Sequence, residues 1–171
     1  ILPMSPAHGV KAVAKEVSRD RVLSDDEIRW LWQAGDVVGY PWGPLARVLL
    51  LTGQRLGEVA GMTRDELAGD LWHLPAARVK NGRAHDVPLS SAALETLAAM
   101  PRIGDSYLFT TTGRSPVSGY FKAHNRLAET MEEIAGQEIE HWTFHDLRRT
   151  CATGLARLGI PVRVTEAVLN H

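Results

Sequence analysis

The sequence predicts an α+β domain that is mainly α-helical and carries a small antiparallel β-sheet at one edge. Most segments between Val22 and His171 place apolar residues at helical spacing, and they begin at Ser, Thr or Pro residues. Residues 71–89 instead form short extended stretches around Asn81-Gly82, a dipeptide typical of tight turns between strands. Helices therefore dominate, and the strands are confined to one region.

Composition indicates a globular protein of ordinary make-up. Of the 171 residues, 44% are hydrophobic and 23% charged, and neither a signal peptide nor a run of about 18 apolar residues is found. The single cysteine, Cys151, fits a core position and a reducing cytoplasm. A net charge of −1 argues against indiscriminate coating of nucleic acid. Basic residues nevertheless gather between Ala76 and Leu127, which predicts a local positive surface.

Residues 1–22 show no periodicity and predict an interdomain linker, which leaves 23–171 as one domain. Capping residues, prolines and apolar spacing predict the helices. The first begins at Ser24, with Glu27 completing a capping box, and the second runs from Pro41 to Leu51 and is expected to be fully buried. Three more are expected: from Ser90 or Ser91 to Met100, over 118–134 with Phe121 and Leu127 on its apolar face, and over 162–169.

The sheet is expected from three stretches, 71–74, 77–79 and 84–89, and Asn81-Gly82 predicts a hairpin between the last two. This hairpin would carry Lys80 at its tip. A lysine in such a place is usually a solvated turn residue, and the alternative is a side chain that reaches into DNA and delivers a proton.

The segment 142–158 predicts the central helix, capped by Thr143 with Asp146 in the first turn. Its expected apolar face consists of Leu147, Cys151, Leu155 and Leu158. His145 and Arg148 would emerge near the helix N-terminus, where backbone N–H groups and the helix dipole favour a phosphate. These two side chains are therefore candidates for holding a phosphodiester.

A second candidate pair follows the buried helix and the Gly53 turn. Arg55 and Glu58 are three residues apart and share one face of a short helix. A surface ion pair of small value is one interpretation. The other is an inward-pointing arginine that binds an anion and is held in place by Glu58.

The motifs TGQRLGE, KNG followed by VPLS, HDLRRTCATGLARLG and a closing LNH occur in this order. Together they resemble the catalytic domain of the tyrosine recombinases, or phage integrase family, in particular the integrases of prophages and genomic islands. The resemblance covers nearly everything from Val22 to His171. It implies a tyrosine-recombinase catalytic-domain fold and a site-specific recombinase that cleaves and rejoins DNA strands through a 3′-phosphotyrosyl intermediate.

The resemblance also implies roles for individual residues. Arg55 and Arg148 would clamp the scissile phosphate, with Glu58 supporting Arg55. Lys80 would protonate the leaving 5′ oxygen, His145 would assist proton removal from the nucleophile, and His171 would hydrogen-bond the phosphate. Further contacts to DNA phosphates are expected from four basic residues, although a solvated face explains those on the 118–134 helix equally well: Arg83, Lys122, Arg126 and Arg149.

This chemistry needs no metal, ATP or other cofactor, because guanidiniums stabilise the charge and a covalent protein–DNA bond replaces the broken one. The family's tyrosine nucleophile would follow the LNH histidine, and Tyr40, Tyr107 and Tyr120 match no motif. We therefore expect a fragment that lacks its N-terminal DNA-clamping domain and its C-terminal tail and is inactive by itself. The expected partner is double-stranded DNA with attachment-type sites, bound by a homotetramer of the full-length protein, with the fragment monomeric and no membrane involved.

Two other classes of protein remain open. A type IB topoisomerase shares this chemistry, and a non-catalytic DNA-binding relative would use the fold to regulate recombination. A metal hydrolase built on His141 and His145 is a third alternative, but the pair lacks the glutamate of an HExxH motif.

Overall fold

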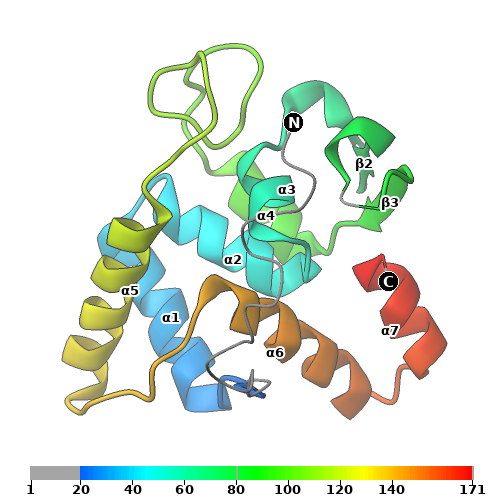
Figure 1. Cartoon of the computed structure of the whole chain (residues 1–171). Helices are drawn as coiled ribbons and strands as arrows, with labels where there is room; N and C mark the ends of the chain where they lie inside the picture. The colour runs from blue at the N-terminus through cyan, green and yellow to red at the C-terminus, as the bar shows by residue number, and fades with distance from the viewer. Residues whose placement is uncertain (1–19, 80, 171) are drawn as a thin grey trace, which may run out of the picture.

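The computed structural model describes residues 20–79 and 81–170, and it shows a helical domain with a small sheet at one side (Figure 1). This confirms the predicted α+β class. The helices are α1 (Asp25–Val38), α2 (Trp42–Thr52), α3 (Leu56–Ala60), α4 (Ser91–Ala98), α5 (Tyr120–Ala135), α6 (Phe144–Arg157) and α7 (Val162–Leu169). The remaining elements are the 3₁₀-helices η1 (Arg64–Glu66) and η2 (Ala76–Arg78) and the strands β1 (Leu67–Ala68), β2 (Leu71–Leu74) and β3 (His85–Pro88).

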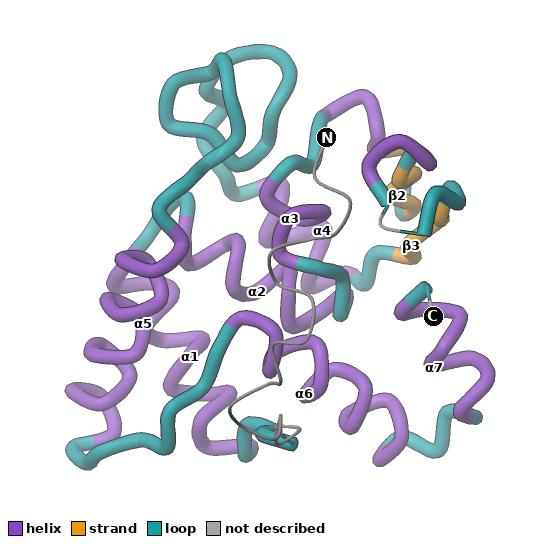
Figure 2. The backbone as a smooth tube through the Cα atoms, in the orientation of Figure 1, coloured by secondary structure: helices purple, strands orange, loops and turns teal. Residues whose placement is uncertain are grey.

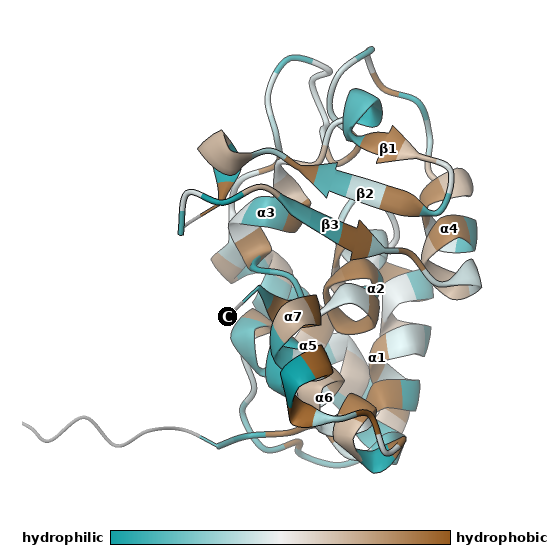
Figure 3. Ribbon diagram, turned by 90° about the vertical axis from the view of Figure 1, so that its right-hand side faces the viewer, coloured by the Kyte–Doolittle hydropathy of each residue, from teal (hydrophilic) through white to brown (hydrophobic). Residues whose placement is uncertain are grey.

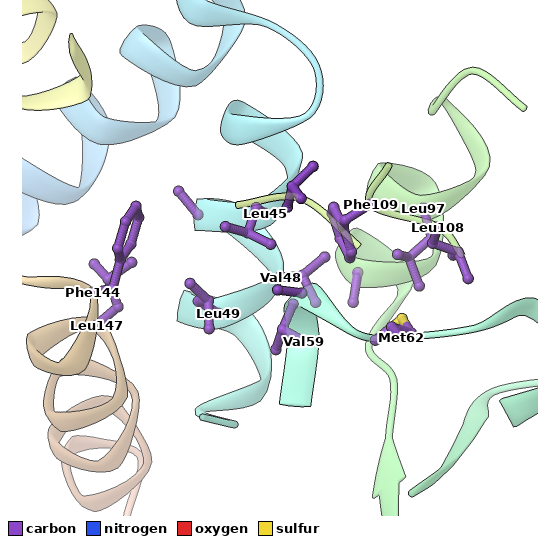
Figure 4. Close-up of a cluster of buried hydrophobic side chains, with 14 of the residues drawn as sticks. Leu45, Val48, Leu49, Val59, Met62, Leu97, Leu108, Phe109, Phe144 and Leu147 are labelled. Atoms are coloured by element: carbon purple, nitrogen blue, oxygen red, sulfur yellow. The ribbon is translucent and has the colours of Figure 1, made fainter. Parts of the chain in front are cut away.

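Helix α2 is the centre of the core and packs against α1, α4 and α6. Its side chains Leu45, Val48 and Leu49 lie between α6 and the buried segment around Phe109, as Figure 4 shows. The expectation that α2 is fully buried is wrong for Leu50 and Leu51, which are only partly buried. The Arg47 guanidinium packs against α1, where it donates to the Trp32 carbonyl at 2.6 Å.

The start of the domain is fastened to both α1 and α6. The capping box predicted for α1 is confirmed, since Ser24 N donates to Glu27 Oε2 at 2.7 Å. Arg21 pairs with Glu27 and also reaches the Glu140 carbonyl before α6, at 3.3 Å. Leu23 N donates to Thr150 Oγ1 of α6 at 3.0 Å. Residues 21–23 therefore contact the folded body directly, while residues 1–19 of the expected linker lie outside the described residues.

The sheet has the order β1-β2-β3, with antiparallel pairs throughout, and it lies at one end of the helices (Figure 3). Trp72 pairs with Val87, and both are buried. The predicted strand at 77–79 is wrong. Those residues belong to η2 and its C-cap, because Arg78 is drawn toward α3 and η1 by the contacts described below. Strand β3 pairs with β2 instead, so Asn81-Gly82 lies within the long connection 75–84 and does not form a two-residue hairpin turn.

Two predicted core residues are exposed. Helix α5 begins at Tyr120 because Gly119, with φ +92°, ends the preceding loop, and Phe121 is 77% exposed. Leu158 at the end of α6 is 79% exposed, because α7 turns away there. Figure 2 shows the long loop that precedes α5 and the short one between α6 and α7. Within 20–79 and 81–170, no helix has the length and apolar character to cross a bilayer.

Gly53 ends α2 in the left-handed conformation, with φ +64°. A Cβ there would lie 2.6 Å from Leu169 Cδ2 and 3.1 Å from Cys151 Sγ, so α6 and α7 approach this turn closely. Only glycine combines the required backbone conformation with the available space.

We expect Gly53→Ala to lower the free energy of unfolding by about 2–4 kcal/mol, through backbone strain and overpacking together. Urea denaturation measures this. Gly136→Ala is the matched control, since Gly136 has φ +66° but nothing within 4 Å of its Cβ position. It should cost only about 1–2 kcal/mol, the strain alone. Equal losses for the two variants would contradict close packing at Gly53.

Candidate functional site

The site is built on the N-terminal turn of α6. Thr143 N and Oγ1 both donate to Asp146 Oδ2, each at 2.8 Å, so the predicted cap is present. The Asp146 carboxylate is completely buried and also accepts from Arg149 Nη1 at 2.7 Å. The first turn of α6 is therefore rigidly held, and His145 and Arg148 project from a fixed support.

Arg148 is a buried guanidinium, 5% exposed, that joins three parts of the chain. Its Nη1 donates to the Gly53 carbonyl at 2.7 Å, and its Nη2 donates to the Leu169 carbonyl at 2.6 Å. A guanidinium has five N–H donors, so three remain for a ligand. Burial and the nearby Arg55 lower the pKa of Arg148, which marks a place where positive charge accumulates and an anion is favoured.

Arg55 is held by Glu58 in two ways. Glu58 Oε2 accepts from the Arg55 backbone N at 2.9 Å, and Oε1 accepts from Arg55 Nη1 at 3.0 Å. Glu58 is only 5% exposed, whereas the Arg55 side chain is 29% exposed. The pair is therefore not the weak surface ion pair considered above. It presents a guanidinium in fixed orientation, close enough to Arg148 for the two positive charges to interact, although Arg55 lines a separate hollow from that of Arg148.

His145 completes the cluster. It lines a hollow of about 190 Å³ together with Arg148, Arg149, Ala152 and Leu169. His145 is exposed, and the part of its ring that is shielded from water lowers its pKa. The positive charges of Arg149, Arg148 and Arg55 lower this pKa further, against an opposing contribution from Asp146. The imidazole is thus biased toward its neutral form, which can accept a proton.

Lys80 and His171 lie outside the described residues. Their neighbours in the chain, Asn81 and Asn170, are hydrogen-bonded to each other at 2.9 Å between Nδ2 and Oδ1. The end of α7 therefore lies against the connection that follows η2. The roles expected for Lys80 and His171 stay predictions.

The other predicted DNA contacts are distributed over the surface. Lys122 and Arg126 are exposed on α5 and line a separate hollow of about 280 Å³ with Trp42. Arg83 is exposed in the connection before β3. Of the four predicted DNA contacts, only Arg149 shares the hollow of His145 and Arg148.

Sequence reasoning missed two side chains that hold α7 in place. Gln54 is buried and donates from Nε2 to the Val168 carbonyl at 2.7 Å. His85 Nε2 on β3 lies 3.0 Å from the same carbonyl and is therefore its second donor. The position of Gln54, directly before Arg55, was the only signal available. No sequence signal pointed to His85, because its hydrogen bond to Val168 depends on the packing of β3 against α7.

The metal-hydrolase alternative depends on how the histidines and acidic residues are grouped in space. Within the described part of the chain, no group of three or more His, Cys, Asp or Glu side chains is arranged to bind a metal ion. His141 lines a different hollow from that of His145, next to His124 with ring centroids 5.7 Å apart. Cys151 is only partly buried, so the predicted core position is wrong in part. Burial still raises the pKa of its thiol to about 11, which disfavours the thiolate form that a metal ligand requires.

Comparison with known proteins agrees with this arrangement. The Phage integrase family profile matches residues 21–171, and the chain therefore belongs to the phage integrase family, the tyrosine recombinases. Prophage integrase IntA of Escherichia coli (strain K12) is 32% identical over 124 residues, which is 71% of this chain and 29% of that protein. The chain thus spans less than a third of this relative's length.

Solved structures confirm the recombinase catalytic-domain fold. The lambda integrase catalytic core has a TM-score of 0.69 at 21% identity, covering 90% of this chain and 92% of that one. A lambda integrase (75–356) dimer bound to a COC′ core site has a TM-score of 0.73 at 22% identity, covering 94% and 60%. The Tn1549 transposon integrase in complex with a circular intermediate DNA has a TM-score of 0.75 at 18% identity, covering 91% and 59%.

We expect Arg149→Gln to raise the pKa of His145 by removing a nearby positive charge. The Cε1 proton of His145, followed by NMR through a pH titration, should then titrate at higher pH than in the unchanged protein. Arg157→Gln is the control, because Arg157 is an exposed arginine at the far end of the same helix. An unchanged His145 titration in the Arg149 variant would show that the charge of Arg149 does not contribute to the pKa of His145.

Proposed function

We propose that this domain catalyses DNA strand cleavage and rejoining in site-specific recombination, as part of a longer natural protein. The observation that carries the proposal is the meeting of Arg55, His145 and Arg148 around Gly53 and the end of α7. Two guanidiniums beside a neutral imidazole suit a phosphodiester whose equatorial oxygens gain negative charge during attack.

In the proposed reaction, a tyrosine oxygen attacks the scissile phosphorus and the bond from phosphorus to the 5′ oxygen breaks. His145 assists removal of the tyrosine proton, and Lys80 gives a proton to the leaving 5′ oxygen. Arg55 and Arg148 bind the non-bridging oxygens, and His171 hydrogen-bonds the phosphate. The phosphotyrosyl bond replaces the broken one, so the step is reversible and needs no external energy source.

The attacking tyrosine is proposed to come from outside the present 171 residues. Tyr40 is committed to structure, since its hydroxyl donates to the Leu108 carbonyl at 2.9 Å. The Tyr120 hydroxyl donates to the Val117 carbonyl at 2.9 Å. Tyr107 forms a backbone bridge with Thr63 at the edge of the loop before α5. None of these three tyrosines lines the hollow of His145 and Arg148.

The proposed substrate is double-stranded DNA with attachment-type sites of a mobile element, in the cytoplasm. The full-length protein would act as a homotetramer, and the domain alone would be a monomer. A regulatory DNA-binding relative without catalysis is the second candidate. The buried support of Arg55 by Glu58 argues against it, because a relative without catalysis has no need to keep an arginine in the fixed orientation that stabilises charge at a reacting phosphate.

The first test uses the natural full-length protein, incubated with nicked duplexes that carry the candidate junction sequence. We expect a DNA adduct that survives denaturing gels and is lost or slowed by about 10²-fold or more in Arg148→Ala. Because Arg148 also holds Gly53 and α7, Arg55→Ala is tested in parallel. Specific binding without any adduct would favour the regulatory relative, and absence of DNA binding would contradict both proposals.

A second test concerns α5. Arg126→Gln should weaken binding to every duplex sequence alike and reduce the slope of log affinity against log salt by about one. Fluorescence anisotropy at several salt concentrations measures both effects. Arg29→Gln is the charge-matched control, since Arg29 is exposed on α1 and paired with Asp26. An effect of Arg126→Gln no larger than that of the control would place α5 away from DNA.

A further inference from the structure

Arg78 has no role in the motifs of the family, yet it makes the contacts that fix η2. Its Nη2 donates to the Glu58 carbonyl at 2.6 Å, and its Nη1 pairs with the Glu66 carboxylate. Gly61 leaves room for this arrangement, because a Cβ there would lie 2.8 Å from Arg78 Nη2. Arg78 therefore joins the connection between β2 and β3 to the helix that presents Arg55.

The partner Glu66 is itself fixed. Its side chain is buried, and Oε2 accepts from Trp72 Nε1 at 2.9 Å and from Thr63 N at 3.2 Å. A buried carboxylate needs a cation and hydrogen-bond donors, and Arg78 supplies the cation. Since these donors come from β2 and from the N-terminus of η1, the guanidinium is held by a rigid frame.

Arg78 also lines a hollow near the site. This hollow, about 480 Å³, is lined by Arg55, Gly57 and Glu58 of the α3 region and by Ala77, Arg78 and Val79. The Val79 side chain is buried in the core, so the chain is anchored immediately before position 80. The distance across the hollow, from Arg55 to this anchor, depends on the bond from Arg78 to the Glu58 carbonyl.

We propose that Arg78 is a positioning residue for the proton-donating step: it holds Ala76–Val79 at a set distance from Arg55 and thereby places the attachment point of Lys80. This rests on the proposed function, in which Arg55 binds the scissile phosphate and Lys80 protonates the leaving 5′ oxygen. The proposed role needs no contact between Arg78 and DNA, because the bonds of its guanidinium to the Glu58 carbonyl and the Glu66 carboxylate are enough to hold residues 76–79 in place.

The test separates proton donation from every other contribution to the rate. It compares single-turnover adduct formation by the full-length protein on two nicked duplexes, one with the natural 5′ oxygen and one with sulfur in its place at the scissile bond. A thiolate leaves without protonation far more readily than an alkoxide, so a defect in the general acid disappears on the sulfur substrate. Lys80→Ala should therefore be slow on the oxygen substrate and recover its rate on the sulfur substrate, which we call rescue by sulfur. Arg55→Ala should be slow on both substrates.

We expect Arg78→Met to slow cleavage of the oxygen substrate by about tenfold or more. On the sulfur substrate, the cleavage rate of this variant should approach that of the unchanged protein. Arg78→Lys, which restores charge without the two-sided guanidinium, should behave in the same way. Arg102→Met is the matched control, because Arg102 is an exposed arginine paired with Asp105 in the loop before α5, and it should leave both rates unchanged.

Equal slowing of Arg78→Met on both substrates, with Lys80→Ala still rescued by sulfur, would overturn the role of Arg78 while leaving the proposed function intact. If Arg78→Met fails to fold, as shown by circular dichroism, Arg78→Lys decides by the same criterion. No rescue of Lys80→Ala would remove Lys80 as the acid, and no adduct with the unchanged protein would contradict the proposed function. Either result would overturn the role of Arg78 as well.

Discussion

The two hydrogen bonds from Arg148 to the carbonyls of Gly53 and Leu169 are the constraint on which the rest of the site depends. They tie α6 to the turn after α2 and to the end of α7. A lysine cannot replace this geometry, because a single ammonium does not offer planar donors in two fixed directions together with further donors for a ligand. The residue expected to bind substrate is thus also the one that assembles the pocket, so structural and chemical roles cannot be separated at this position.

Buried carboxylates explain how a protein of net charge −1 maintains a cationic site. Glu58 holds Arg55, Asp146 holds Arg149, and Glu66 holds Arg78. In each pair the acid is buried and the arginine is more exposed. In these three pairs the negative charge lies inside the domain and orients a guanidinium that is closer to the surface. The net charge of this chain is consequently a poor guide to whether it binds anions. The positions of its acidic and basic side chains are a better guide.

Local sequence predicted what depends on local interactions. The caps at Ser24 and Thr143 follow from residues three apart, and so does the pairing of Arg55 with Glu58. The family motifs then identified the cluster around Arg148. What could not be predicted depends on tertiary contact. A stretch with apolar ends at 77–79 suits a strand, but the attraction of Arg78 to two distant acceptors turns it into η2.

The same reasoning explains the other differences. Leu158 and Phe121 have helical spacing relative to core residues, but no element packs over them, and spacing alone does not reveal where a covering element ends. Gln54 is a polar residue in a buried turn, and its partner Val168 is more than a hundred positions away in the chain. A sequence pattern shows which face of a helix is apolar more reliably than it shows which other elements pack against that face.

The attachment of residues 21–23 has a mechanical consequence. Leu23 N is bonded to Thr150 Oγ1, and Thr150 Oγ1 donates to the Asp146 carbonyl one turn earlier on α6. Arg21 forms an ion pair with Glu27 of α1 and donates a hydrogen bond to the Glu140 carbonyl just before α6. A pulling force applied to the chain ahead of Arg21 is therefore delivered first to α1 and to the helix that carries His145. Movement of residues 21–23 is thus coupled to α1 and α6 through these hydrogen bonds.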